Sequence, residues 1–202
     1  MPRLIKNRQI VEDNWLLLEE ADSDKLQELA ASDLIIPLQS WLDWQQASQI
    51  DSQQADQQDS QQADQEENQQ GDQPDSQQKF REALAERSGR IAVWLDSNEL
   101  PAQLGESLYY LDMIALNFPV FRDGRPFSSA RELRQNLNFK GDIRAVGDVL
   151  RDQLFYMQRC GFTEFTMRED QNLEQALSAF EDFHEAYQSS VDRPLPLFRR
   201  RV

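Results

Sequence analysis

The chain has 202 residues and a formal net charge of −15 at pH 7, with 39% hydrophobic residues. This length suits one domain with its own core, and the acidity argues against sequence-independent binding to DNA or RNA, whose phosphates would be repelled. The sequence has no apolar run long enough to span a bilayer, residues 1–9 are charged rather than signal-like, and the lone Cys160 has no partner for an internal disulfide. We therefore expect a single-domain cytoplasmic protein, residues 1–202, that binds neither nucleic acid nor membrane.

The amino-terminal residues 1–44 predict a hairpin and a short helix that pack on the core. Apolar runs within residues 4–18 flank a polar turn, which indicates two antiparallel strands. A short helix is expected around residues 26–30, followed by a buried extended run at residues 34–38. Trp41 is more typical of packing than of a stacking platform.

Between residues 45 and 78 the composition changes to Gln, Asp, Ser and Ala, and the string DSQQADQ occurs twice. This segment has almost nothing apolar to bury, so folding it would cost conformational entropy without a compensating gain. We predict a disordered insert in a surface loop. Since it holds eight acidic residues, the rest of the chain is only mildly acidic.

After the insert, helical and strand patterns alternate, which is typical of right-handed βα units around a parallel sheet. The predicted elements are helix 79–87, strand 90–95, helix 102–111, strand 113–118, helix 129–137, strand 143–146, helix 149–160, strand 165–167 and helix 173–188. The boundaries rest on capping signals: Ser129 with Glu132, Asp148, Gly161, and Asn172 with Gln175. Residues 79–190 thus form an α/β core, either half of a (β/α)8 barrel or an open flavodoxin-like sheet, with the amino-terminal β-hairpin added.

Basic residues gather in this core, where residues 113–168 hold nine cations and six acids. In both folds the ligand site lies at the carboxyl ends of the parallel strands, so polar groups from several loops are expected to meet at one rim. Such a rim suits sulfate, sulfite, phosphate or a carboxylate. The candidate residues for an anion or a partner are Arg122, Asp123, Gly124, Arg125, Ser128, Arg131, Arg144, Gly147, Asp148, Arg151 and Asp152. The alternative is that the arginines pair with Asp123, Asp148 and Asp152 in a purely structural network.

The stretch Ile114–Gly161, with IALNFPVFRDGRPFSSARELR and IRAVGDVLRDQLFYMQRCGF, resembles a bacterial family of uncharacterised proteins encoded beside assimilatory sulfite reductase. That family is described as an oxidoreductase involved in sulfite reduction, and it has no established catalytic residues. The resemblance extends to the amino-terminal hairpin and to RIAVWL, whereas the insert at residues 45–78 departs from the family pattern. The motif positions it carries over are Phe118, Asp123, Gly124, Arg125, Ser128, Arg131, Arg134, Arg144, Gly147, Asp148, Arg151, Asp152 and Gln153.

The resemblance implies an accessory protein that docks on sulfite reductase or its electron donor and assists electron delivery or assembly. The sequence has no GxGxxG, no Walker loop and no cysteine cluster, so no cofactor and no metal are predicted, although a flavin remains an option. The alternative is a small oxidoreductase or other enzyme that binds an anionic substrate or a flavin phosphate at the rim. Asp148 or Asp152 would then act as acid or base, and Arg125, Arg144 and Arg151 would clamp the anion. A third possibility is a homo-oligomer in which a second copy covers an exposed sheet edge.

The carboxyl-terminal residues 191–202 follow the last predicted helix with two prolines, the apolar residues Leu195, Leu197 and Phe198, and three successive arginines, which predicts an extended basic tail. This tail is either a docking peptide for an acidic, partly apolar surface or a frayed end. His184, the single histidine, is expected to pack at a helix edge rather than to act as a base, and Cys160 is expected to be a buried apolar group.

Overall fold

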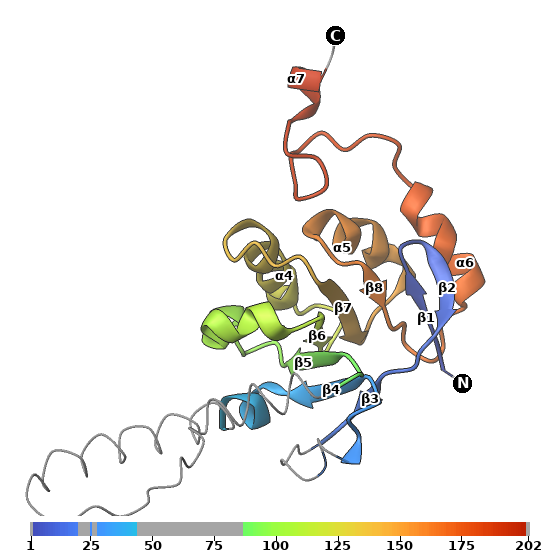
Figure 1. Ribbon diagram of the computed structural model, residues 1–202. Helices are drawn as coiled ribbons and strands as arrows, with labels where there is room; N and C mark the ends of the chain where they lie inside the picture. The colour runs from blue at the N-terminus through green and yellow to red at the C-terminus, as the bar shows by residue number, and fades with distance from the viewer. Residues whose placement is uncertain (1, 20–24, 26–27, 44–86, 201–202) are drawn as a thin grey trace, which may run out of the picture.

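The computed structural model describes residues 2–19, 25, 28–43 and 87–200 (Figure 1). The elements are β1 (Arg3–Lys6), β2 (Gln9–Glu12), β3 (Leu16–Leu17), β4 (Leu34–Pro37), β5 (Ile91–Leu95), η1 (Pro101–Tyr110), β6 (Met113–Phe118), α4 (Arg125–Gln135), β7 (Asp142–Gly147), η2 (Arg151–Gln153), α5 (Leu154–Cys160), β8 (Glu164–Phe165), α6 (Leu173–Ala176), η3 (Leu177–Glu181) and α7 (Leu197–Arg200). The predicted insert at residues 45–78, residues 26 and 27 of the predicted short helix and all but Arg87 of helix 79–87 lie outside the described residues.

The described strands form one sheet of eight in the order β2-β1-β8-β7-β6-β5-β4-β3. Strands β3 to β8 are parallel and follow the chain order, while β1 pairs antiparallel with β8 and with β2. A flavodoxin-like sheet would reverse its strand order at a switch point, so the sequential order identifies the half-barrel alternative. The predicted α/β class and the amino-terminal hairpin are confirmed.

Sequential right-handed crossovers place η1, α4 and α5 on the same face of the sheet (Figure 1). The main core lies between these helices and the sheet, and every second strand residue points into it, as Val93 and Ile114 do. The other strand residues form a smaller buried cluster on the opposite face, made of Ile35, Ala92, Met113 and Ala115. Because both faces of the sheet are covered, the strands have apolar residues at consecutive positions rather than at alternate ones, as in IAVWL of β5.

The opposite face is crossed by a short connection, which we call the strap, residues 13–15. It joins β2 at one edge of the sheet to β3 at the other edge, so the chain must pass over the sheet. Trp15 of the strap packs on the smaller cluster. The guanidinium carbons of Arg90 and Arg144 lie 4.7 Å and 5.9 Å from the centroid of the Trp15 ring, close enough for cation–π attraction.

Several element boundaries differ from the sequence predictions for identifiable reasons. Helix α4 begins at Arg125 rather than at residue 129, because Pro126 suits the first helical turn and Asp123 Oδ1 accepts the Arg125 N–H at 3.0 Å. The helix predicted at residues 102–111 is a 3-10 helix interrupted at Gly105, whose φ is 52°.

The third crossover helix begins with η2, and the Gln153 side chain accepts the Leu150 N–H, so the predicted cap at Asp148 is wrong. The helix predicted at residues 173–188 consists of α6 and η3 and ends at Glu181; the chain beyond it is held against α5 by Arg159, which donates to the Gln188 carbonyl.

The aromatic and capping predictions agree better with the structure. Trp41 is fully buried and its Nε1 donates to Ser107 Oγ at 2.8 Å, which confirms its packing role. Gly161 ends α5 with a φ of 110°, as the sequence predicts for a left-handed cap. His184 is exposed rather than packed.

The tail was predicted to be extended, but it contains the short helix α7. Figure 1 shows this segment projecting away from the sheet. None of the helices within the described residues is both long and apolar enough to cross a membrane.

Candidate functional site

The carboxyl ends of β5 to β8 bring four loops together at one rim of the sheet, which we call the strand-end rim: residues 96–100, 119–125, 147–153 and 168–170. Asn117 Nδ2 at the end of β6 donates to Asp96 Oδ1 at 3.0 Å, which links the first two loops. Arg168 Nη1 donates to Asp148 Oδ1 at 2.8 Å, which links the last two. The loops therefore form one hydrogen-bonded surface rather than four independent ones.

Three of the four arginines of this rim are paired with carboxylates. Arg125 contacts both oxygens of Asp123, with Nη2 2.6 Å from Oδ2, and its hydrogen bonds lower the pKa of Asp123 well below the ordinary range. Arg168 also binds Asp170 through two nitrogens, both 2.7 Å from carboxylate oxygens.

Arg151 reaches outward from the rim. It binds Asp182 at 2.8 Å and Ser178 at 3.0 Å. A carboxylate that binds an arginine through both oxygens neutralises most of its charge, so such an arginine attracts a small anion only weakly.

Arg144 lies away from the rim, on the sheet face that the strap crosses. Its side chain is 3% exposed, and it binds Glu164 at 2.8 Å and Asp13 at 3.0 Å. Glu164 and Asp142 also contact the amino group of Lys6, at 2.8 Å and 2.5 Å. Burial opposes ionisation of Asp142, but hydrogen bonds from Lys6 and Thr163 keep its pKa below the ordinary value. This buried ion network anchors the strap, and it directs the Arg144 guanidinium at Glu164 and Asp13 rather than at the rim.

The remaining sequence candidates are dispersed. Arg122 and Asp152 are exposed on the rim and have no hydrogen bond or ion pair among the described residues. Gly124 precedes the first turn of α4, and Ser128 and Arg131 lie further along that helix, in a shallow depression on its outer side. Gly147 ends β7 with a φ of 93°, and a Cβ there would lie 2.4 Å from the Phe118 carbonyl oxygen, so this position requires glycine.

An exposed apolar loop, which the sequence analysis did not single out, lies at the centre of the rim. Val120 and Phe121 are 46% and 45% exposed, and Leu100 of the neighbouring loop is 58% exposed. The backbone beneath them is fixed: Asp148 Oδ2 accepts the Phe121 N–H at 2.8 Å, and Gln153 Nε2 donates to the Phe121 carbonyl at 3.1 Å. The signal in the sequence is the apolar run FPVF, which continues past the end of β6 into a charged turn.

The charge of the rim differs from the expectation. Its four loops carry four arginines against seven carboxylates: Asp96, Glu99, Asp123, Asp148, Asp152, Glu169 and Asp170. Of the three surplus cations of residues 113–168, one lies in the rim, where four acids from outside that range outweigh it, and the other two lie on the outer helices and near the amino ends of the strands. Within the described part of the chain, no group of His, Cys, Asp and Glu side chains is arranged to hold a metal ion.

Comparison with known families identifies a family for this chain. A family model described as a bacterial protein of unknown function (DUF934) covers residues 92–198, which is more than half of the chain and includes the whole strand-end rim. No curated protein matches the chain.

Proposed function

The chain belongs to this DUF934 family of bacterial proteins, and we propose that it is an accessory protein of assimilatory sulfite reduction. It docks on sulfite reductase or on the electron donor of that enzyme and assists electron delivery or assembly. The sulfite context rests on the resemblance of residues 114–161 described above. The docking role rests on the geometry of the rim.

The observation that carries this proposal is the fixed, exposed loop at Val120 and Phe121. A flexible loop would lose conformational entropy on binding, whereas this backbone is already held by Asp148 and Gln153. Aromatic side chains presented in this way dominate the binding energy of many protein interfaces. The ion pairs around this loop form a polar border, as is usual around the apolar centre of a protein interface.

The C-terminal tail supplies a second exposed apolar surface. Leu195 and Phe198 are 52% and 58% exposed, and Glu185 holds the tail in place by accepting from Arg193 and Arg200 at 2.8 Å and 3.0 Å. A surface built this way suits an apolar partner region with acidic neighbours.

The enzymatic alternative has less support from the described residues. The three arginines proposed as anion clamps, Arg125, Arg144 and Arg151, each bind a carboxylate of the protein itself. A substrate anion would have to displace those carboxylates. A flavin absorption spectrum in the purified protein would nevertheless favour this alternative.

The test measures binding of the full-length chain to purified sulfite reductase and to its electron donor by biolayer interferometry. We expect the double variant Val120→Ser, Phe121→Ser to weaken the Kd about tenfold or more, with a thermal midpoint within about 2 °C of the wild type. Tyr109→Ser is the matched control, because Tyr109 is 81% exposed but lies on η1, outside the rim.

Two results would count against the proposal. Equal affinity of the double variant and the wild type would remove the rim from the interface. If the wild type bound neither protein, the docking function itself would be refuted. Removal of residues 195–202 in a third variant separates the contribution of the tail from that of the rim.

A further inference from the structure

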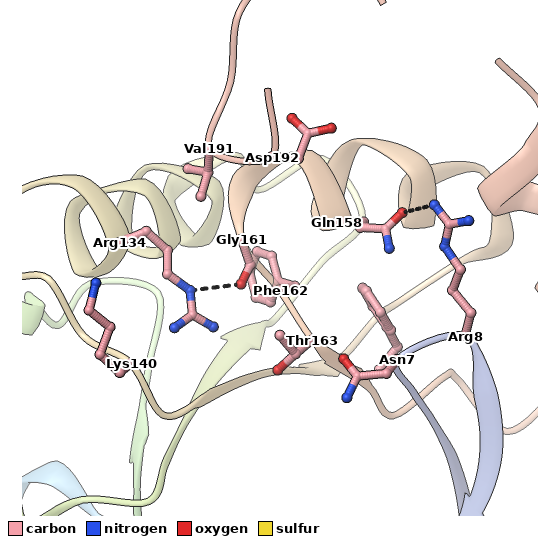
Figure 2. A pocket seen from close by; sticks show the side chains of 11 residues that line it. Asn7, Arg8, Arg134, Lys140, Gln158, Gly161, Phe162, Thr163, Val191 and Asp192 are labelled. Atoms are coloured by element: carbon pink, nitrogen blue, oxygen red, sulfur yellow. Dashed lines mark hydrogen bonds between the residues drawn. The ribbon is translucent and has the colours of Figure 1, made fainter. Parts of the chain in front are cut away.

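A pocket lies at the opposite end of the sheet from the strand-end rim, where β7 and β8 begin. It has a volume of about 380 Å³ and is enclosed by the carboxyl ends of α4 and α5, the turn of the β1–β2 hairpin and the tail near Val191 (Figure 2). This volume is within the range of sites that bind small organic molecules. Its lining residues are Asn7, Arg8, Arg134, Lys140, Gln158, Gly161, Phe162, Thr163, Phe165, Val191 and Asp192.

The lining is cationic. The lining contains three cations, Arg8, Arg134 and Lys140, and one carboxylate, that of Asp192, which lies 3.6 Å from Nε of Arg159. In a chain of net charge −15, three cations around one pocket with no carboxylate of their own concentrate a positive field there. This is the counterpart of the rim, where carboxylates outnumber arginines.

Arg134 is held rigidly without an ion pair. Its Nε donates to the Gly161 carbonyl at 3.1 Å, and its Nη1 donates to the carbonyls of Phe139 and Gly141, both at 2.8 Å. Burial lowers its pKa from the ordinary value, but an arginine stays charged at neutral pH. Within the described residues, Nη2 has no acceptor, so two N–H groups of a fixed guanidinium remain available.

The carbonyl groups that end α4 and α5 would repel an anion if they were unpaired. Arg134 places a positive charge beside these helix ends, because the three carbonyls it binds belong to residues that follow α4 and α5. Lys140 is exposed and has no hydrogen bond or ion pair with another described residue. Figure 2 shows its amino group on the same side of the pocket as the Arg134 side chain.

Arg8 occupies a backbone position that favours glycine. It is the second residue of the hairpin turn and has a φ of 65°, a conformation that strains a side chain of its size. Its Nη2 donates to Gln158 Oε1 at 2.9 Å, and its guanidinium carbon lies 5.7 Å from the Phe180 ring. A guanidinium is thus fixed across the pocket from Arg134 at a local cost in backbone energy.

We infer that this pocket binds a small organic anion that carries a phosphate or sulfate group. The oxyanion is held by Arg134 and Lys140, and the apolar part of the ligand contacts Phe162, Phe165 and Val191. The inference does not depend on docking at the strand-end rim, because the pocket and that rim lie at opposite ends of the sheet.

The test compares thermal melting of the full chain in sodium phosphate, in phenyl phosphate and in sodium chloride at matched ionic strength. A ligand present at ten times its Kd is expected to raise the midpoint by about 3–5 °C above the chloride reference. Phenyl phosphate gives the larger rise if the apolar wall takes part, whereas equal rises for the two phosphates identify the free oxyanion as the ligand. No rise above chloride with either compound would overturn the inference.

Two variants locate the site. Lys140→Glu is expected to weaken phosphate binding at least tenfold, whereas Arg122→Glu is expected to change it less than twofold. Arg122 is the matched control, since it is an exposed arginine on the rim without an ion pair among the described residues. Arg8→Gly removes the second guanidinium and relieves the strained turn, so it is expected to weaken binding while the protein stays folded. Equal effects of Lys140→Glu and Arg122→Glu would show nonspecific charge screening and would contradict the proposed site.

Discussion

Replacing Arg144 with methionine tests the buried ion network that anchors the strap. The variant leaves the Asp13 carboxylate with only the Trp15 N–H, at 3.2 Å, while Glu164 retains Lys6 at 2.8 Å. Removing one partner of a buried ion pair costs about 3–5 kcal/mol, because the other charge stays buried without compensation. Since Lys6 partly compensates Glu164, we expect a loss near 3 kcal/mol in the free energy of unfolding. For a chain of this size, such a loss lowers the thermal midpoint by about 6–12 °C.

Urea denaturation followed by circular dichroism measures this loss. Arg3→Met is the matched control, because it removes the same charge from an ion pair with Glu174 whose two side chains are 53% and 58% exposed, and exposed ion pairs contribute less than about 1 kcal/mol. The double variant Arg144→Met, Glu164→Met replaces both buried charges with apolar groups and is expected to recover part of the loss. A loss in Arg144→Met no larger than in Arg3→Met would refute the assignment of the strap's stability to this network.

Three further results are expected. Hydrogen bonds from Arg125 lower the pKa of Asp123 below its ordinary value of 3.8. The ionised Asp123 carboxylate therefore stabilises the fold above about pH 4, and this stability is lost as the pH falls further. A thermal midpoint that stayed constant in a melting series from about pH 6 to about pH 2 would contradict this. Burial raises the pKa of the Cys160 thiol, so a disulfide exchange reagent at pH 8 is expected to react only as fast as the protein opens, and rapid stoichiometric labelling of the folded chain would be inconsistent with its burial. Gly147→Ala is expected to destabilise the folded protein by about 1–3 kcal/mol, because the φ of this residue is 93° and the new Cβ would lie 2.4 Å from the Phe118 carbonyl oxygen. Gly105 also has a positive φ but has open space around it, so Gly105→Ala measures the contribution of backbone strain alone.

The strands were predictable from sequence because burial on both faces leaves an unambiguous signal. The run at residues 113–118 matches β6 at both ends, and the run at residues 90–95 matches β5 to within one residue. The half-barrel could not be separated from an open sheet, since strand order depends on contacts between distant segments that leave no local pattern.

Helix boundaries were harder to predict, because local hydrogen bonds compete with the capping patterns. Ser129 and Glu132 have capping-box spacing, yet both lie inside α4, which begins four residues earlier. The stronger local signal was Asp123 followed by Pro126, since the aspartate accepts the Arg125 N–H and the proline has its φ fixed for a first turn. At Asn172 no such competitor exists, and the predicted cap forms with the Gln175 N–H at 2.8 Å.

The candidate site shows why a count of charges along the sequence cannot locate an anion site. Residues 113–168 carry three more cations than acids, but each arginine has a different environment in the fold. Arg125 is neutralised by the carboxylate two residues before it, and Arg144 is buried between carboxylates that come from other strands and from the strap. Arg134 bonds only to backbone carbonyls, so its charge remains available to a ligand. Arg122 on the strand-end rim also lacks an ion pair among the described residues, but seven carboxylates share that rim with it, so the positive field lies at the amino ends of β7 and β8.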